Sequence, residues 1–184
     1  MLGASLLLGL WLLVPLSPET LLFGAGDLRQ TFGLTGAVPF HAASFVVIEA
    51  SITACHALAV GLIVRLLCAR LRVAYLIVPL FLLLCLLIAT LAAAILGSPG
   101  DALAWLTPGV QLGLMVSGAL LAVAIALPVT PRLIITALAL MAGTVLVNLA
   151  PPNPYSAAAL AAWRQGHFLN FNGLTRWVAT LWPF

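Results

Sequence analysis

The sequence predicts an all-α fold, a polytopic helical bundle that is integral to a membrane. Hydrophobic residues make up 64% of the 184 residues and charged residues only 6%, whereas ordinary soluble domains carry roughly 25% charged residues. The apolar residues gather in runs of ~17–25 residues, a length that matches a ~30 Å hydrocarbon core. With so few charges on its surface the chain must face lipid, so the bilayer is its first expected partner.

We expect one transmembrane domain over residues 1–184, with about five spans and a partial last helix. The expected spans cover residues 2–14, 43–67, 73–97, 110–127 and 133–149. The first is short, but it lacks the basic region of a signal peptide and is interpreted as a membrane segment. The last apolar stretch, 174–184, is too short to cross a bilayer. These short ends predict that the chain is cut or forms part of a larger membrane protein.

The last two full spans are expected to pack against each other. Only residues 128–132 connect them, and so short a turn predicts antiparallel neighbours. Small residues at i, i+4 spacing, Gly118 with Ala122 and Ala139 with Gly143, are expected to let the two backbones approach closely.

The distribution of arginine predicts the orientation of the bundle. Four arginines lie in two loops on one side, and the positive-inside rule places such loops in the cytoplasm. The other side holds the remaining three, Arg29, Arg164 and Arg176, partly offset by Glu19, Asp27 and Asp101. The N-terminus is then cytoplasmic, and the loops 15–42, 98–109 and 150–173 face outward. The cytoplasmic group comprises Arg65, Arg70, Arg72 and Arg132.

Charge and motifs argue against several classes of function. The net charge of +3 is small and dispersed, which argues against nucleic-acid binding. Cys55, Cys68 and Cys85 fit neither a CxxC metal site nor a disulfide framework, and are interpreted as packing residues. The chain has no GxSxG nucleophile elbow, P-loop or Gly-rich dinucleotide loop. No catalytic residue, metal or cofactor is therefore predicted.

A stripe of polar residues inside the span 43–67 is the first candidate site. Glu49 and His56 are seven residues apart, which places them within ~20° on a helix, and Thr53 lies between them. A charged group that faced lipid at this depth would cost several kcal/mol, so the stripe is expected to face the interior of the bundle.

Three interpretations of this stripe remain open. It can be a structural hydrogen-bond clamp between helices, a site for a polar headgroup or a proton relay, or a catalytic or metal site. A metal site would need His41 and His167 to join Glu49 and His56 on the outer side, and no HExxH or similar spacing supports it.

The segment 150–173 is the second candidate site, because it turns abruptly polar after the last full span. The simpler interpretation is a re-entrant or interfacial connection. The sharper one is an outer surface that recognises a glycan or a lipid headgroup, since amide and aromatic side chains suit sugars. Its candidate residues are Asn153, Tyr155, Trp163, His167, Asn170 and Asn172.

Several loop strings resemble the C-terminal membrane region of VanZ-like proteins from proteobacteria. The similarity runs from about Gly26 onward, and the chain lacks the Asn…Pro-hydrophobic-Gly, Glu-x-x-Gln and Asp-x-x-x-Asn-x-x-Gly elements of the defining VanZ-like domain. No functional residue can therefore be carried over from that domain. The strings are Gly26-Asp27-Leu28-Arg29, Trp105-Leu106-Thr107-Pro108-Gly109, Asn153-Pro154-Tyr155, Leu169-Asn170-Phe171-Asn172-Gly173-Leu174 and Trp182-Pro183.

The resemblance implies a place in the bacterial envelope, in the inner membrane, and through the family's namesake a link to glycopeptide resistance. The expected function is that of a non-enzymatic accessory region that binds lipid, a cell-wall precursor or a membrane partner. A missing N-terminal VanZ-like domain is one such partner. The alternative is a small transporter or an intramembrane enzyme that uses Glu49 and His56.

Overall fold

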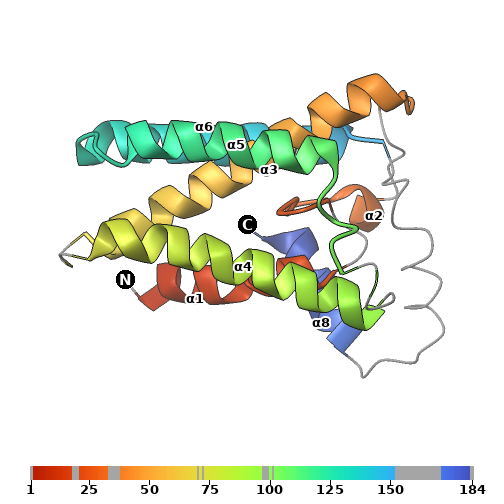
Figure 1. The fold of residues 1–184 in the computed structure, drawn as a ribbon, viewed down its shortest axis with the longest axis horizontal. Coiled ribbons are helices and arrows are strands. Elements are labelled where there is room, and N and C mark those ends of the chain that lie inside the picture. Colours follow the sequence, from red (N-terminus) through yellow and green to blue (C-terminus); the bar gives the residue numbers. More distant parts are fainter. Residues whose placement is uncertain are drawn as a thin grey trace.

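The computed structural model describes residues 2–17, 21–32, 38–69, 71, 73–96, 100, 102–151 and 171–182. All regular secondary structure in these residues is helical, which confirms the all-α prediction for this part of the chain (Figure 1). The elements are α1 (Leu2–Trp11), the 3₁₀ helix η1 (Val14–Leu16), α2 (Arg29–Phe32), α3 (Ala42–Leu67), α4 (Ala74–Leu96), α5 (Pro108–Ala124), α6 (Val129–Leu149) and α8 (Phe171–Leu181).

Three of these helices, α3, α4 and α6, are long and apolar enough to cross a membrane. Helix α5 has 17 residues, which at ~1.5 Å per residue falls slightly short of a ~30 Å hydrocarbon core. Helix α1 has only 10 residues. The structure therefore supports a membrane protein with three long apolar helices, and the predicted five spans are not confirmed.

Helix α3 is the centre of the bundle. In its most apolar stretch 67% of the residues are buried, compared with 22% in α4 and 28% in α6. Helices α4, α5 and α6 all pack on α3. Glu49, Thr53 and His56 of α3 therefore lie inside the protein, and α4 and α6 present most of their surface to the surroundings.

Helix α5 packs closely on α3 through small residues spaced four apart. Gly109, Gly113 and Ser117 are buried on one face of α5. A Cβ atom at Gly113 would lie 2.6 Å from the carbonyl oxygen of Ala50 and 2.7 Å from Cβ of Thr53. Only glycine permits this approach of the two backbones.

The prediction that the last two full spans approach each other through their small residues is wrong. Gly118 lies on the exposed face of α5, where an added Cβ atom would have no neighbour within 4 Å. Gly143 is buried, but against the imidazole ring of His56 on α3. Both α5 and α6 thus use their small residues to approach α3, because α3 is the helix on which both of them pack. The observed turn also differs from the expected residues 128–132. Helix α5 ends at Ala124 and α6 begins at Val129, so the turn comprises residues 125–128. Pro131 lies in the first turn of α6, where a proline is tolerated.

The two ends of the bundle differ in character. The end of α3, the start of α4 and the α5–α6 turn lie together at the left of Figure 1, where α1 also begins. We call this the arginine end, because Arg65 lies in the last turn of α3 and Arg132 near the start of α6. The opposite end, with the loop 21–29 and Thr107, is called the loop end.

Aromatic side chains join the first and last segments of the chain. The ring of Trp11 packs on Phe23 at 4.9 Å, on Trp182 at 6.1 Å and on Phe81 of α4 at 6.2 Å between centroids. The indole nitrogen of Trp182 also donates to the carbonyl of Leu7 at 3.0 Å. These contacts hold α1 and α8 against α4 and the loop.

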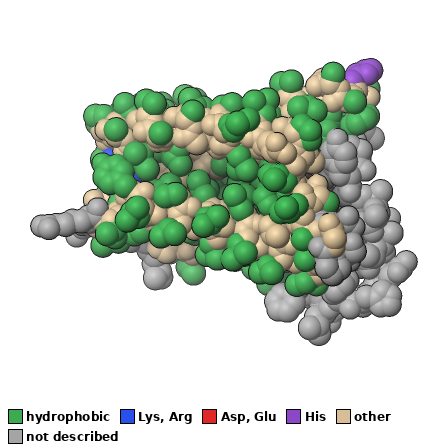
Figure 2. All heavy atoms as spheres, viewed as in Figure 1, with side chains coloured by type: hydrophobic (Ala, Val, Ile, Leu, Met, Phe, Trp, Pro, Cys, Tyr) green, Lys and Arg blue, Asp and Glu red, His purple; other side chains and the backbone are tan. Residues whose placement is uncertain are grey.

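Large hydrophobic side chains cover the outside of the bundle. Figure 2 shows a nearly continuous apolar surface along the long helices, with one small recessed area of basic side chain at the arginine end. Such a surface suits lipid and would associate in water. On α4 the exposed residues include Leu76, Leu80, Leu83, Leu87 and Leu91.

Candidate functional site

A buried loop without helical structure lies at the centre of the candidate site. Residues 21–26 are all buried, although none of them is in a helix. The amide of Gly24 donates to the carbonyl of Leu21 at 2.8 Å and closes a turn. Phe23 has φ of 64° in this turn, a conformation that costs ~1–2 kcal/mol for a residue with a side chain. The complete burial of the Phe23 ring against Trp11 offsets this cost.

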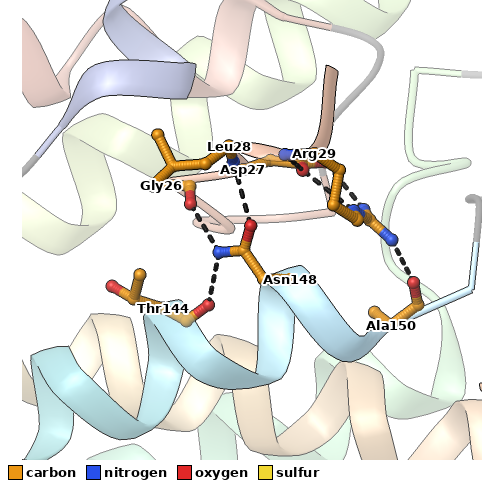
Figure 3. Close-up of polar contacts among 7 residues, drawn as sticks. All are labelled: Gly26, Asp27, Leu28, Arg29, Thr144, Asn148 and Ala150. Carbon is orange, nitrogen blue, oxygen red and sulfur yellow. Dashed lines mark hydrogen bonds and ion pairs between the residues drawn. The ribbon is translucent and has the colours of Figure 1, made fainter. Parts of the chain in front are cut away.

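Asn148 of α6 holds this loop in place (Figure 3). Its Nδ2 donates to the carbonyls of Gly26 and Thr144, both at 2.8 Å, and its Oδ1 accepts from the amide of Leu28 at 3.0 Å. One amide side chain therefore satisfies polar groups of the loop and of its own helix. Because irregular backbone at membrane depth needs partners within the protein, Asn148 is a structural requirement of the loop.

Gly26 is the point at which the loop meets α8. Its φ is 85°, and a Cβ atom there would lie 3.1 Å from the carbonyl oxygen of Trp182 and 3.3 Å from a methyl carbon of Thr144. The amide of Gly26 donates to the carbonyl of Ala179 at 2.7 Å. The glycine is thus needed both for its backbone conformation and for the space around it.

An ion pair completes the loop. Arg29 donates from Nε to Oδ1 of Asp27 at 2.9 Å and from Nη2 to Oδ2 at 2.7 Å. Its Nη1 also donates to the carbonyl of Ala150, at the end of α6 (Figure 3). The guanidinium is therefore engaged on both sides, and it ties the loop to the last residues of α6 before the segment 152–170.

Glu49 is bonded to the start of α5. Its side chain is 3% exposed, and its Oε2 accepts from the hydroxyl of Thr107 at 2.6 Å. The same hydroxyl oxygen caps α5 by accepting from the amide of Val110 at 3.2 Å. The carboxyl group occupies the space next to Gly109, where a Cβ atom would clash with Oε2.

Thr53 and His56 contact other elements. The hydroxyl of Thr53 donates to the carbonyl of Leu22 in the loop at 3.3 Å. His56 is fully buried, with Nδ1 at 3.0 Å from the carbonyl of Ile52 and its ring against Gly143 and Trp182. Since a carbonyl only accepts, Nδ1 carries the proton in this bond and Nε2 of the neutral ring is an acceptor. Nε2 makes no hydrogen bond of good geometry within the described part of the chain, although the backbone of Ala25 in the loop lies close enough to interact with the ring.

The predicted polar stripe therefore faces the interior, but its members do not share one site. Glu49 contacts α5, Thr53 contacts the loop, and His56 contacts α6 and α8. Each of them fastens a different element to α3. This arrangement favours a structural clamp for Glu49 and Thr53, and leaves His56 with one buried nitrogen that makes no hydrogen bond of good geometry within the described residues.

The residues proposed for metal binding do not come together within the described residues. No group of three or more His, Cys, Asp or Glu side chains there could hold a metal ion. His41 is exposed at the start of α3, far along the helix from His56. His167 lies outside the described residues.

The second predicted site cannot be placed. Five of its residues, Asn153, Tyr155, Trp163, His167 and Asn170, lie outside the described residues. Asn172 belongs to the first turn of α8, but its side chain is not described. The outer binding surface therefore stays a prediction.

Two residues of the site, Asn148 and Thr107, were not expected from the sequence. Asn148 is a lone amide near the end of a long apolar run, and a polar group in such a run needs a partner. Thr107 precedes a proline and a glycine at the start of an apolar run, which is a helix-start signal. Both signals are present in the sequence, but neither identifies the distant partner.

No protein-family model, curated protein or solved structure matches this chain.

Proposed function

We propose that this chain is a non-enzymatic, VanZ-like accessory region of the bacterial inner membrane, and that it binds a lipid-linked polar ligand at its loop end. A cell-wall precursor, a polyprenyl diphosphate that carries a disaccharide, is the ligand class that fits an envelope protein of this kind. The observation that carries the proposal is the irregular backbone of residues 21–28, of which 21–26 are buried. Asn148 and the Asp27–Arg29 pair hold this segment in place.

The loop end contains irregular backbone that specific side chains hold in place. Irregular backbone in a membrane domain is costly unless it is enclosed, so a bundle of simple helices would form more readily. In this protein the amide of Asn148 and the Asp27–Arg29 ion pair hold the loop, and two of its residues have positive φ. The segment 152–170, rich in amide and aromatic residues in the sequence, continues directly from Pro151 at this end.

The proposed orientation follows the arginine distribution. Arg65 and Arg132 lie at one end of the bundle, and the positive-inside rule assigns that end to the cytoplasm. The loop end then faces the outer side of the membrane, where lipid-linked precursors are used. The start of α1 is at the arginine end (Figure 1), in keeping with a cytoplasmic N-terminus.

Binding of a polyprenyl diphosphate-linked disaccharide to the full chain in nanodiscs tests the proposal. Asn148→Ala removes both side-chain hydrogen bonds to the loop and is expected to weaken binding about tenfold. Asp27→Asn is a second variant that disturbs the loop without emptying a buried position. Ser117→Ala is the control, because it removes a buried hydroxyl that, among the described residues, donates to the carbonyl of Leu114 within α5. Equal binding by the wild type and both loop variants, with normal helix content, contradicts the proposal.

A second function is favoured by one observation at His56. The ring is fully buried, and its Nε2 makes no hydrogen bond of good geometry within the described residues, with only the backbone of Ala25 near the ring on that side. A buried ionisable group of this kind is typical of one that exchanges a proton or binds a substrate. An intramembrane transporter or enzyme would then work through Glu49 and His56. Proton flux into proteoliposomes should be present in the wild type and absent in Glu49→Gln and His56→Asn. A wild-type flux equal to that of empty liposomes rules out the proton-transport form of this second function.

A further inference from the structure

The arginine end carries two guanidinium groups whose charge no carboxylate balances in the part of the chain that the structure describes. Nε and Nη1 of Arg65 and Nη1 of Arg132 are buried and have no hydrogen-bond partner among these residues. Arg132 is only 6% exposed, and its Nε reaches the carbonyl of Pro128 at 3.5 Å, the limit of a hydrogen bond. Buried guanidinium groups normally have acceptors, because each donor left without one is costly.

The two arginines lie at nearly the same level of the bundle. Helices α3 and α6 run antiparallel, with His56 opposite Gly143. Arg65 follows His56 by nine residues and Arg132 precedes Gly143 by eleven, so their levels differ by two residues, or ~3 Å along the axis. Both are close to the end of a long apolar helix, the depth at which lipid phosphates lie.

The surroundings of Arg65 and Arg132 supply an aromatic ring but no described acid. The guanidinium carbon of Arg65 lies 4.8 Å from the centroid of the Tyr75 ring, which orients the group at the start of α4. Residues 50–100 and 102–184 contain no Asp or Glu. Of the two acids that the structure describes, Asp27 and Glu49, both are bonded at the loop end.

We infer that Arg65 and Arg132 form a binding site for the phosphate group of an anionic phospholipid, with Tyr75 as its aromatic wall. A phosphate provides the oxygen acceptors that the guanidinium groups lack, in a geometry that suits two arginines. A lipid brings it to this depth while its acyl chains cover the neighbouring apolar surface. The site lies at the opposite end from the loop, so it is independent of the proposed function.

Lipid enrichment in nanodiscs of equal phosphatidylcholine and phosphatidylglycerol tests this site. The full chain should retain phosphatidylglycerol on native mass spectrometry, and Arg65→Gln or Arg132→Gln should each lower the enrichment about fivefold. The double variant should lower it further than either single variant, and the two effects need not multiply, because both arginines bind the same phosphate. Arg132→Lys should keep part of the enrichment, since it retains the charge and loses the planar fork.

Matched variants separate the site from general effects of charge and fold. Tyr75→Leu should weaken enrichment, whereas Tyr75→Phe should not, because it keeps the ring face. Arg176→Gln removes one charge from α8 and should leave enrichment unchanged. Circular dichroism of every variant verifies its helix content.

Two results overturn the inference. One is equal retention of both lipids by the wild type, or an equal loss in Arg176→Gln and Arg132→Gln. The other is arginine-dependent binding of inorganic phosphate in nanodiscs of phosphatidylcholine alone, without enrichment of phosphatidylglycerol. That second result would mean that the site takes a soluble anion and not a lipid.

Discussion

At the scale of single residues, the hydroxyl of Thr107 both caps a helix and binds a buried carboxyl group of another helix. Its hydroxyl oxygen accepts from the amide of Val110 and so caps α5, and its hydroxyl proton goes to Glu49 of α3. A carboxyl group that would be costly in a membrane interior is thereby tied to a helix start. The start of a helix carries partial positive charge, which further suits a carboxyl group.

Thr107→Val is expected to lower the free energy of unfolding by ~2–3 kcal/mol, the sum of a lost helix cap and a lost hydrogen bond to a buried group. Thr107→Ser keeps the hydroxyl and should stay within ~1 kcal/mol of the wild type. Unfolding in mixed detergent and sodium dodecyl sulfate micelles measures both. A valine variant as stable as the serine variant would mean that Glu49 is not held by this bond.

At the scale of helices, the packing of α5 on α3 depends on which face of α5 carries a glycine. The Cβ atom of an alanine at position 113 would lie 2.6 Å from a backbone oxygen of α3, while position 118 is open. A backbone atom cannot move aside as a side chain can. The two glycines of the same helix therefore form a natural test pair.

Gly113→Ala is expected to destabilise the protein by ~2 kcal/mol or more, because α3 and α5 must separate. Gly118→Ala should be neutral or stabilising by up to ~1 kcal/mol, since alanine is the better helix former. The same micelle unfolding measurement compares the two. Equal effects at both positions would show that the α3–α5 contact is looser than the distances at Gly113 indicate.

The helices themselves could be predicted from the apolar runs, but their contacts could not. The run 43–67 becomes α3 (Ala42–Leu67) almost without change. Gly118 was misassigned because both faces of a membrane helix are apolar, so hydrophobic periodicity does not reveal which face meets protein. The bond between Asn148 and Leu28 joins residues 120 positions apart, and no local pattern encodes such a pairing.

At the scale of the whole molecule, the orientation can be measured by cysteine labelling. In a variant whose native cysteines are replaced by alanine, Ser44→Cys at the loop end and Ala69→Cys at the arginine end supply two exposed positions. A membrane-impermeant maleimide should label Ser44→Cys in intact cells and Ala69→Cys only after the inner membrane is opened. The reverse pattern would place the loop end in the cytoplasm.

The contact between Gly26 and Ala179 has a consequence for the synthesis of the protein. The residues near the N-terminus leave the ribosome first, yet the amide of Gly26 receives its acceptor only when Ala179 has been made. Until then the rings of Trp11 and His56 lack the contact with Trp182 that covers one side of each of them. A chain that stops before α8 is therefore expected to insert its long helices and still be degraded, so that arrival of α8 serves as the signal that the domain is complete.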